Sequence, residues 1–287
     1  MPNVITLNDE NVGEEFKLVR SNAPTLRARC ERLNIASGAL FPFELDDFPV
    51  QPAVLFDYSS DTPLADISGN GLDLSIQAGG VFITDIVPGY RALYCDLGCR
   101  LGNATPGPAP LLQYGDLTIF TIGMFDFLPS QSSLIAFGGT SDLETQNHLW
   151  MQRVPNNNLA RNMEWFHEHG AGINDSFATP LVGALAPSLP PVHVPYLITS
   201  VRRVDGANCF VQHYSGPLPF FSEIGPLPVP TGGTLATLQV TTASSVDTNP
   251  NRQLLFSQAV VPYAATASDV LTIYNAKMGG LYGLFTP

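Results

Sequence analysis

Proline and glycine are spread along almost the whole chain and limit the length of any regular element. The sequence of 287 residues contains 25 prolines and 25 glycines. Proline ends helices and cannot donate to the interior of a sheet, while glycine is typical of tight turns. Between these residues lie short apolar segments, and several alternate with a period of two, as in residues 117–124. This pattern favours a β-sandwich or barrel of many short strands.

The alternation and the turn residues together predict where the strands lie. The expected strands are residues 53–58, 72–77, 80–84, 90–95, 115–127, 132–138, 147–154, 162–168, 194–204, 208–214, 233–241 and 252–261. The proline-rich segments are expected to be extended loops: 105–112, 185–195 and 217–230. One helix is predicted near the end, where Thr266 and Asp269 fit an N-cap with an acidic first turn. Gly279-Gly280 is expected to end it.

The first fifty residues differ from the rest in charge and in turn content. The spacing of Leu26, Cys30 and Leu33 favours a short helix over residues 23–35. We therefore predict an N-terminal arm or assembly segment at residues 1–52, followed by one β domain at residues 53–287. An N-terminal extension packed on that domain is the alternative.

The charge of the chain excludes some functions. Charged residues make up 13%, the formal net charge is −12, and Lys17 and Lys277 are the two lysines. No run of Lys or Arg forms a stripe for phosphates, so we expect no direct nucleic-acid binding. A surface with so few charges favours a protein packed against neighbours, although a neutral polar β protein would look the same. Four N-terminal arginines are expected to pair with acidic patches on a partner protein: Arg20, Arg27, Arg29 and Arg32.

Neither a leader nor a membrane segment is expected. The first fifteen residues lack a basic stretch followed by an apolar core, so we predict no secretory signal. No apolar run is long enough to cross a bilayer, so we predict no membrane insertion. We expect the protein to be intracellular or to leave the cell by assembly and lysis. Four cysteines, at Cys30, Cys95, Cys99 and Cys209, form neither a disulfide framework nor a zinc pair and are expected to be buried or half-buried.

The order of several motifs resembles the concanavalin A-like lectin/glucanase superfamily in its laminin-G-like form. That resemblance implies an all-β fold, an antiparallel jelly-roll β-sandwich with an N-terminal arm and one short C-terminal helix. Residues 55–58 and the turn Asp66-Ile67-Ser68-Gly69-Asn70-Gly71 are similar to the opening strand and turn of the family. The other similar segments are a central core strand at 117–125, paired strands at 195–202 and 211–216, and the final helix at 267–274.

Some relatives bind calcium through acidic and amide oxygens around this turn. The resemblance therefore implies Asp66, Asn70 and Asp73 as calcium ligands, with backbone carbonyls completing a hard-oxygen shell. The alternative is an Asx-type turn, in which these side chains only accept from or donate to the backbone.

The most chemically varied strand is Trp165-Phe166-His167-Glu168-His169. In an extended strand Trp165, His167 and His169 share one face. They could form an aromatic and imidazole platform for a sugar or a pair of metal ligands, while a structural role is the alternative. Asn157, in the nearby Asn156-Asn157-Asn158 turn, offers an amide that suits carbohydrate hydroxyls.

A catalytic constellation is missing from the sequence. Glycosidases of this superfamily carry closely spaced carboxylates on one strand. Glu44-Leu45-Asp46-Asp47 is the nearest imitation, but it lies in the predicted arm and lacks a third carboxylate. We therefore predict that the protein is not an enzyme.

These patterns lead to two hypotheses for function, and a purely architectural protein, in which the sandwich contributes only subunit contacts, is a third possibility. The first is a structural protein of a virion, in a tailed bacteriophage, that decorates the capsid or forms part of a fibre or tail. Its partners would be other virion proteins, its own copies in a homo-oligomer, and a glycan or receptor on a cell surface. The second is a free carbohydrate-binding or carbohydrate-active module. The first hypothesis places the protein in a virion, and the alternative location is the cytoplasm.

Overall fold

A computed structural model describes most of the predicted β domain. The described residues are 42–78, 81–87, 90–95, 100–102, 115–127, 132–138, 148–154, 164–169, 173–178, 195–219, 223–228, 237–241 and 252–285. The predicted arm up to residue 41, its helix at 23–35 and the loop at 105–112 therefore lie outside the described residues, as does Asn157.

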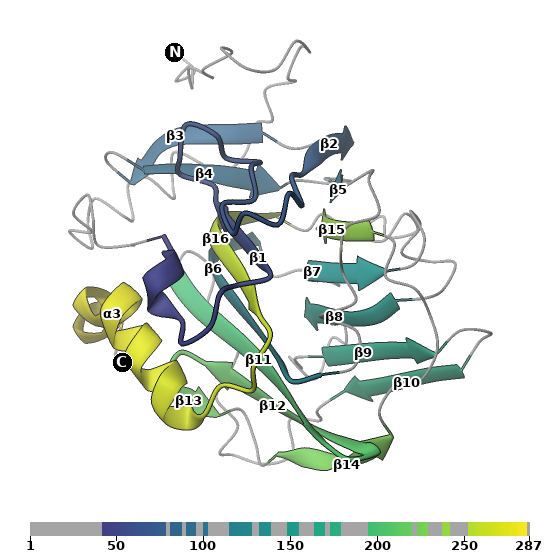
Figure 1. The fold of residues 1–287 in the computed structure, drawn as a ribbon. Coiled ribbons are helices and arrows are strands. Elements are labelled where there is room, and N and C mark those ends of the chain that lie inside the picture. The colour runs from purple at the N-terminus through teal and green to yellow at the C-terminus, as the bar shows by residue number, and fades with distance from the viewer. Residues whose placement is uncertain are drawn as a thin grey trace.

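The strands form two antiparallel sheets (Figure 1). The larger sheet has the order β13 (Leu218–Pro219), β12 (Asn208–Ser215), β11 (Pro195–Asp205), β6 (Leu117–Phe127), β16 (Arg252–Val261), β4 (Tyr90–Cys95) and β3 (Val81–Val87). β1 (Val54–Asp57) also pairs with β16, and β14 (Ile224–Pro228) with β12. The smaller sheet has the order β10 (Ile173–Ala178), β9 (Glu164–His169), β8 (His148–Val154), β7 (Ser132–Gly138), β15 (Thr237–Thr241), β5 (Arg100–Gly102) and β2 (Ser75–Ala78). The prediction of an antiparallel, jelly-roll-like β-sandwich is confirmed.

All twelve predicted strands are present with shifts of their ends, but four further strands were missed. β5, β10, β13 and β14 were not predicted. The segment 217–230 was wrongly expected to be a loop, since it holds β13 and β14. Both strands pair with β12 at the end of the larger sheet. Prolines are tolerated there because an edge strand has one side that needs no donor.

The larger sheet is buried on both faces. Along β6, Leu117 and Ile119 pack in one hydrophobic cluster, whereas Phe120 and Ile122 pack in another. The first cluster also contains Leu101 of β5 and therefore lies between the two sheets. The second contains residues of the C-terminal helix. Successive strand residues point to opposite faces, so a strand with both faces covered has few polar positions.

Polar side chains are also buried between the sheets. The Tyr58 hydroxyl donates to Gln258 Oε1 at 2.8 Å, and Gln258 Nε2 donates to Thr121 Oγ1 at 3.3 Å. His213 Nδ1 lies 2.8 Å from Ser200 Oγ on the neighbouring strand. These hydrogen bonds offset the cost of removing the groups from water.

The helix α3 (Ala267–Phe285) is the one α-helix of the described residues. Its predicted start is confirmed, because Asp269 N donates to Thr266 Oγ1 at 3.2 Å and Thr266 N donates to Asp269 Oδ2 at 2.8 Å. The predicted end is wrong, since the helix continues through Gly279-Gly280. Each glycine costs about 1 kcal/mol relative to alanine, and packing of a helix on a sheet commonly outweighs that.

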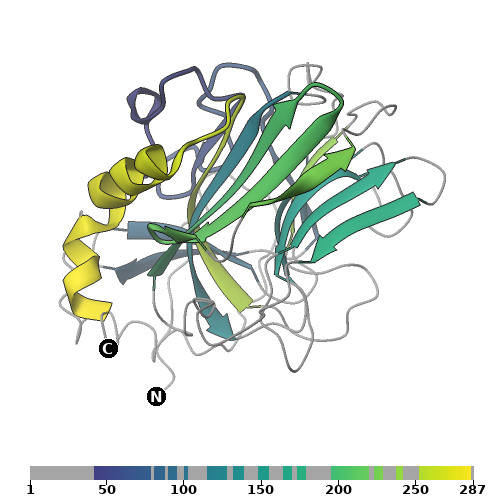
Figure 2. The same cartoon turned by 90° about the horizontal axis from the view of Figure 1, so that it is seen from below.

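Helix α3 covers the face of the larger sheet that points away from the smaller sheet (Figure 2). Val270, Ile273, Tyr274 and Met278 are buried there against residues of β6, β11 and β12. No helix in the described ranges combines the length and the apolar character needed to cross a membrane.

The segment 42–50 lies on the same face as α3. Its two phenylalanines, Phe43 and Phe48, are buried and their rings contact that of Phe120 at centroid distances of 5.9 and 5.4 Å. Asp47, in a short 3-10 turn (Leu45–Asp47), forms an ion pair with Lys277 of α3. This end of the predicted arm is thus part of the core, and the boundary between residues 52 and 53 stays a prediction.

Candidate functional site

The turn after β1 is built around the carboxylate of Asp66. Asp66 Oδ1 accepts from the backbone N–H of Leu55 and of Ser68, each at 3.0 Å, and Oδ2 accepts from that of Leu72 at 3.1 Å. The backbone N–H of Asp66 in turn donates to Asp73 Oδ1 at 2.8 Å. Asp66 is buried, so the carboxylate stabilises the turn by satisfying amides that water does not reach.

Asn70 and Ser68 fasten the same turn to the chain before β1. Asn70 Nδ2 donates to the carbonyls of Pro52 and Ala53 at 3.2 and 3.1 Å, and Ser68 Oγ donates to Ala53 O at 3.3 Å. Gly69 and Gly71 have φ of +86° and +70°, which glycine adopts without strain. The turn therefore makes the contacts expected of an Asx-type structural turn.

These contacts also bear on the predicted calcium ligands. Asp66, Asn70 and Asp73 do come together, but the contacts described above already use the oxygens of Asp66 and the amide nitrogen of Asn70. Within the described ranges, no group of three or more His, Cys, Asp or Glu is placed to hold a metal ion. Calcium binding at this turn stays a prediction.

The predicted platform lies on β9, in the smaller sheet. β9 is extended, as the prediction requires, and pairs with β8 and β10. Trp165 is opposite Phe177 in the β9–β10 register, His167 opposite Asp175, and His169 opposite Ile173. The side chains of these residues lie outside the described features, so the role of the platform in binding stays a prediction.

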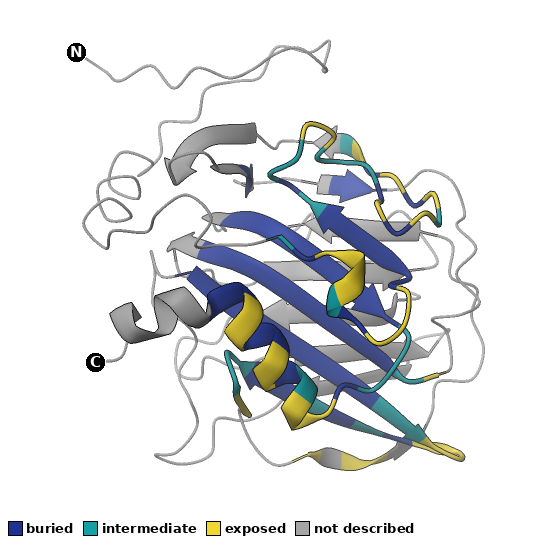
Figure 3. Cartoon of the chain, turned by 60° about the vertical axis from the view of Figure 1, so that its left-hand side comes forward, coloured by how far each residue is buried: buried dark blue, intermediate teal, exposed yellow. Residues whose placement is uncertain are grey.

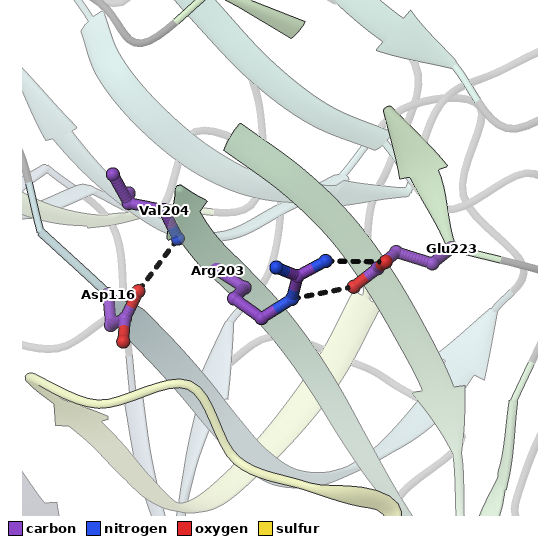
Figure 4. Close-up of polar contacts among 4 residues, drawn as sticks. All are labelled: Asp116, Arg203, Val204 and Glu223. Carbon is purple, nitrogen blue, oxygen red and sulfur yellow. Dashed lines mark hydrogen bonds and ion pairs between the residues drawn. The ribbon is translucent and has the colours of Figure 1, made fainter. Parts of the chain in front are cut away.

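A cluster that the sequence did not reveal lies beside the β11–β12 hairpin (Figure 4). The guanidinium of Arg203 donates to both carboxylate oxygens of Glu223, from Nε at 3.2 Å and from Nη2 at 2.8 Å. The side chains of Arg203 and Glu223 are 42% and 41% exposed. The pKa of Arg203 is raised, mainly by its hydrogen bonds to Glu223. We call Arg203, Phe210 and Glu223 the hairpin cluster.

The aromatic ring of Phe210 packs against the guanidinium of Arg203. Its ring lies directly across the strand pair from Arg203, and the guanidinium carbon lies 4.3 Å from the ring centroid. The ring also lies close to Gly225, where a Cβ would come within 2.4 Å of Phe210 Cδ1. A side chain at position 225 would therefore displace the ring, and the cluster depends on this glycine.

The hairpin that carries the cluster is anchored to β6. Asp116 Oδ1 accepts from the backbone N–H of Val204 at 2.7 Å, as Figure 4 shows. Arg202, the neighbour of Arg203, points to the opposite face and is fully buried, and its Nε donates to Gly115 O at 3.0 Å. Burial lowers the pKa of Arg202 to about 10. Arg203 is therefore exposed on a strand whose position is fixed on both sides.

The sequence did not single out these three residues because each lies in a different context. Arg203 and Phe210 are seven residues apart on two different strands, and Glu223 lies within the segment 217–230, which was predicted to be a loop. The signal that could have found them is the pairing of the strands predicted at 194–204 and 208–214. A short hairpin between these strands places residue 203 opposite residue 210.

The predicted carboxylate segment has a structural role. Asp47 of this segment accepts from the backbone N–H of Glu44 at 2.6 Å and pairs with Lys277. Its carboxylate is therefore engaged in holding α3, and Glu44 and Asp46 are exposed beside it.

Comparison with known proteins supports the fold. No family model and no curated protein matches the sequence. Similar solved structures include the receptor-binding domain of botulinum neurotoxin mosaic serotype C/D, at 10% identity and a TM-score of 0.58 over 82% of this chain and 52% of that one. The receptor-binding domain of botulinum neurotoxin D is 11% identical, with a TM-score of 0.57 over 81% of this chain and 54% of that one.

A third similar structure is of botulinum neurotoxin type C, whose cell entry depends upon interaction with two ganglioside molecules. It is 11% identical, with a TM-score of 0.57 over 79% of this chain and 51% of that one. The chain therefore spans about half the length of the structures it matches. At this identity the likeness shows the fold alone, a β-sandwich, in agreement with the predicted fold class.

Proposed function

We propose that this protein is a glycan-binding β-sandwich module and that the hairpin cluster contacts the glycan. The observation that carries the proposal is the exposed Arg203–Glu223 pair, held in one geometry by Phe210 and by two hydrogen bonds. Sugar recognition needs planar polar groups that donate to and accept from neighbouring hydroxyls. A guanidinium and a carboxylate in one plane supply both.

The surroundings of the cluster favour a neutral ligand. Asp116 and Asp205 lie close enough to act on the charge of Arg203, and Glu223 is paired with it. Three carboxylates therefore surround one exposed cation, which disfavours a phosphate or a sulfate. Arg203 uses two of its five N–H donors on Glu223, so three remain for hydroxyl oxygens.

The structural likeness gives independent support. The similar domains bind receptors, and entry of the type C toxin depends on gangliosides, which carry a glycan. The descriptions of these similar structures name receptor binding and ganglioside interaction, which supports a binding role here. The Trp165, His167 and His169 platform, with Asn157, is a second proposed glycan contact on the smaller sheet.

The experiment that tests the proposal is a screen of the full chain on an array of neutral and acidic glycans, and on vesicles that carry either neutral glycolipids or gangliosides, whose glycans are acidic. Each screen is run with calcium and again with a chelator, because Asp66, Asn70 and Asp73 are the proposed calcium ligands. Saturable binding to a defined set of neutral glycans supports the proposal. No binding to any glycan in either condition contradicts it, and so does binding to acidic glycans alone.

We further propose that the module works on a virion, as a capsid decoration or as part of a fibre or tail of a bacteriophage. Its support is the low fraction of charged residues, 13%, which suits a surface packed against other copies and other virion proteins. The alternative is a free carbohydrate-binding module. Recovery of the protein with purified particles supports the virion role, and its recovery only from host cytosol supports the free module.

A further inference from the structure

The turn after β1 contains the one Asn-Gly step in the sequence, Asn70-Gly71. Asparagine followed by glycine is prone to spontaneous deamidation, because glycine has no side chain to hinder attack by its own backbone nitrogen. Asn70 is half-buried and Gly71 is exposed, so water reaches the step. Figure 3 shows the connection after β1 as largely half-buried or exposed, in contrast to the buried strands of the larger sheet.

The reaction uses only the chain and water. The backbone nitrogen of Gly71 attacks Cγ of Asn70, so that an N–Cγ bond forms and the Cγ–Nδ2 bond breaks. The leaving amide group takes the proton of the Gly71 N–H and departs as ammonia. One water molecule then opens the cyclic imide, either at Cγ to give aspartate or at the backbone carbonyl carbon to give isoaspartate. The sum is one water consumed and one ammonia released, without oxidation or reduction.

The folded turn opposes this reaction through the leaving group. Asn70 Nδ2 donates to the carbonyl oxygens of Pro52 and Ala53 at 3.2 and 3.1 Å. The same nitrogen donates to Ser68 Oγ at 3.2 Å, and the backbone N–H of Asn70 donates to that oxygen at 3.3 Å. Loss of Nδ2 breaks all of its contacts, and closure of the ring changes the dihedral angles of Asn70. The turn therefore has to open before the reaction proceeds.

The product does not fit the folded turn. A carboxylate oxygen would replace Nδ2 and would face the carbonyl oxygens of Pro52 and Ala53, so a donor is replaced by an acceptor that carries the same sign of charge. The turn already holds the carboxylates of Asp66 and Asp73, and Asp73 Oδ1 accepts from the backbone N–H of Asp66 at 2.8 Å. A third carboxylate adds repulsion to the same turn.

We propose that Asn70-Gly71 is a deamidation site, that the folded turn protects it, and that the modified turn does not close again. Segments of a fold open locally to an extent set by their own stability, so the reaction proceeds in molecules whose turn has opened. Because the step is irreversible, modified molecules accumulate with time. The turn thus acts as a one-way switch that records opening, and it does so independently of any glycan contact.

The contacts of Asn70 lie at the entry to the larger sheet, which gives the switch its effect. The backbone N–H of Ala53 donates to the carbonyl of Val260 in β16 at 2.8 Å, and that of Ile67 donates to the carbonyl of Leu55 in β1 at 2.9 Å. The backbone that holds Asn70 is therefore itself paired with β16. Deamidation detaches the turn from this backbone and reduces the stability of β1.

The first test follows conversion of Asn70 in the full chain by peptide mass spectrometry, at neutral pH and with a chelator so that calcium cannot hold the turn. We expect the folded wild type to react at least about tenfold more slowly than the same chain in guanidinium chloride. Asp66→Ala removes the acceptor of three backbone N–H groups in and beside the turn, and should react faster than the wild type without denaturant. Asp205→Ala is the matched control, since it removes an exposed carboxylate of the β11–β12 hairpin and should react as the wild type does.

The second test uses Asn70→Asp, which reproduces the aspartate product. Its Tm should fall by at least about 2 °C, because the carbonyls of Pro52 and Ala53 lose a donor and face a carboxylate. Asn208→Asp adds the same charge at an exposed residue of β12 and should keep the Tm of the wild type.

Four outcomes would overturn the inference: no conversion of Asn70 in denaturant, equal rates in the folded and the denatured wild type, a wild-type rate in Asp66→Ala, or a wild-type Tm in Asn70→Asp. Should Asp66→Ala fail to fold, as circular dichroism would show, the comparison of the wild type with and without denaturant still decides.

Discussion

Lys277 of α3 and Asp47 of the segment before β1 form an ion pair with Nζ 2.7 Å from Oδ2, and the two side chains are only 7% and 14% exposed. The pair joins an element near the end of the chain to a segment more than two hundred residues earlier. It also fixes the two elements that cover the outer face of the larger sheet. The covering of the outer face of the larger sheet therefore depends on an ion pair between two segments that are far apart in the sequence.

Removal of one partner of this pair is expected to destabilise the fold. Lys277→Met keeps the length of the side chain but leaves the Asp47 carboxylate largely buried without its cation. The expected loss is about 3 kcal/mol in the free energy of unfolding, measured by urea denaturation. The double variant Lys277→Met with Asp47→Asn should recover most of it, because the amide oxygen still accepts from Glu44. An equal loss of stability in the single and the double variant would show that the unpaired Asp47 carboxylate does not cause the destabilisation.

A glycine in the central strand is required by close packing. A Cβ at Gly123 would lie 2.6 Å from Tyr196 Oη and 2.7 Å from the carbonyl oxygen of Leu254. Gly123→Ala should therefore reduce the free energy of unfolding by about 1–3 kcal/mol. Gly115→Ala is the matched control, since a Cβ there meets nothing within 4 Å. Similar stabilities for the two variants would contradict the packing described for β6 and β11.

The stability of the protein should fall in mild acid because of His213. This side chain is fully buried, and desolvation lowers its pKa from 6.5 to about 3. The unfolded chain therefore binds a proton at this group before the folded chain does. The contribution of the neutral, buried His213 to the free energy of unfolding is therefore fully present above pH 6.5. It is lost as the pH falls from 6.5 towards 3, by at most about 1.4 kcal/mol per pH unit.

The measurement is urea denaturation of the wild type and of His213→Gln between neutral pH and mild acid. The variant is less stable at neutral pH, since the contact with Ser200 changes, but its stability should depend less steeply on pH. Parallel pH profiles for the two proteins would exclude His213 as the source.

Asp66 should matter for stability whether or not calcium is present. Asp66→Ala removes the acceptor of three backbone N–H groups and is expected to cost about 3 kcal/mol. Asp73→Ala, the control, removes the acceptor of one, at an exposed residue, and should cost about 1 kcal/mol or less. Thermal denaturation with calcium and with a chelator completes the test. A Tm of the wild type that rises with calcium would assign the turn to a metal site.

The sequence predicted the fold well where turn chemistry and alternation agree. β6 was predicted because its period-two pattern persists although both of its faces are buried, and the start of α3 because Thr266 and Asp269 form a local cap. The end of α3 was missed because Gly279 and Gly280 have poor helix propensity, and propensity does not register tertiary packing. β14 was missed because Gly225, Pro226 and Pro228 are typical of loops, although an edge strand accepts them.

The candidate site was harder to predict than the fold. The contacts of Asp66 are local, so its turn could be anticipated from Asp66, Ser68 and Asn70. The hairpin cluster joins Arg203 to Phe210 across a strand pair and to Glu223 through a third strand. A short hairpin between two predicted strands accounts for Arg203 and Phe210, but the place of Glu223 depends on the path of β14, which lies in a segment predicted to be a loop.

The central claim is that the hairpin cluster binds glycan, and its most direct test is the affinity of the full chain for a glycan selected on the array. Titration calorimetry measures the affinity of the wild type, of Glu223→Gln and of Arg203→Ala. The control is Asp61→Asn, which removes one exposed carboxylate far in sequence from the hairpin cluster. We predict that both cluster variants lose affinity at least about tenfold, while Asp61→Asn binds as the wild type does. Exposed ion pairs contribute little to stability, so all variants should stay folded. Wild-type affinity in both cluster variants would contradict the account.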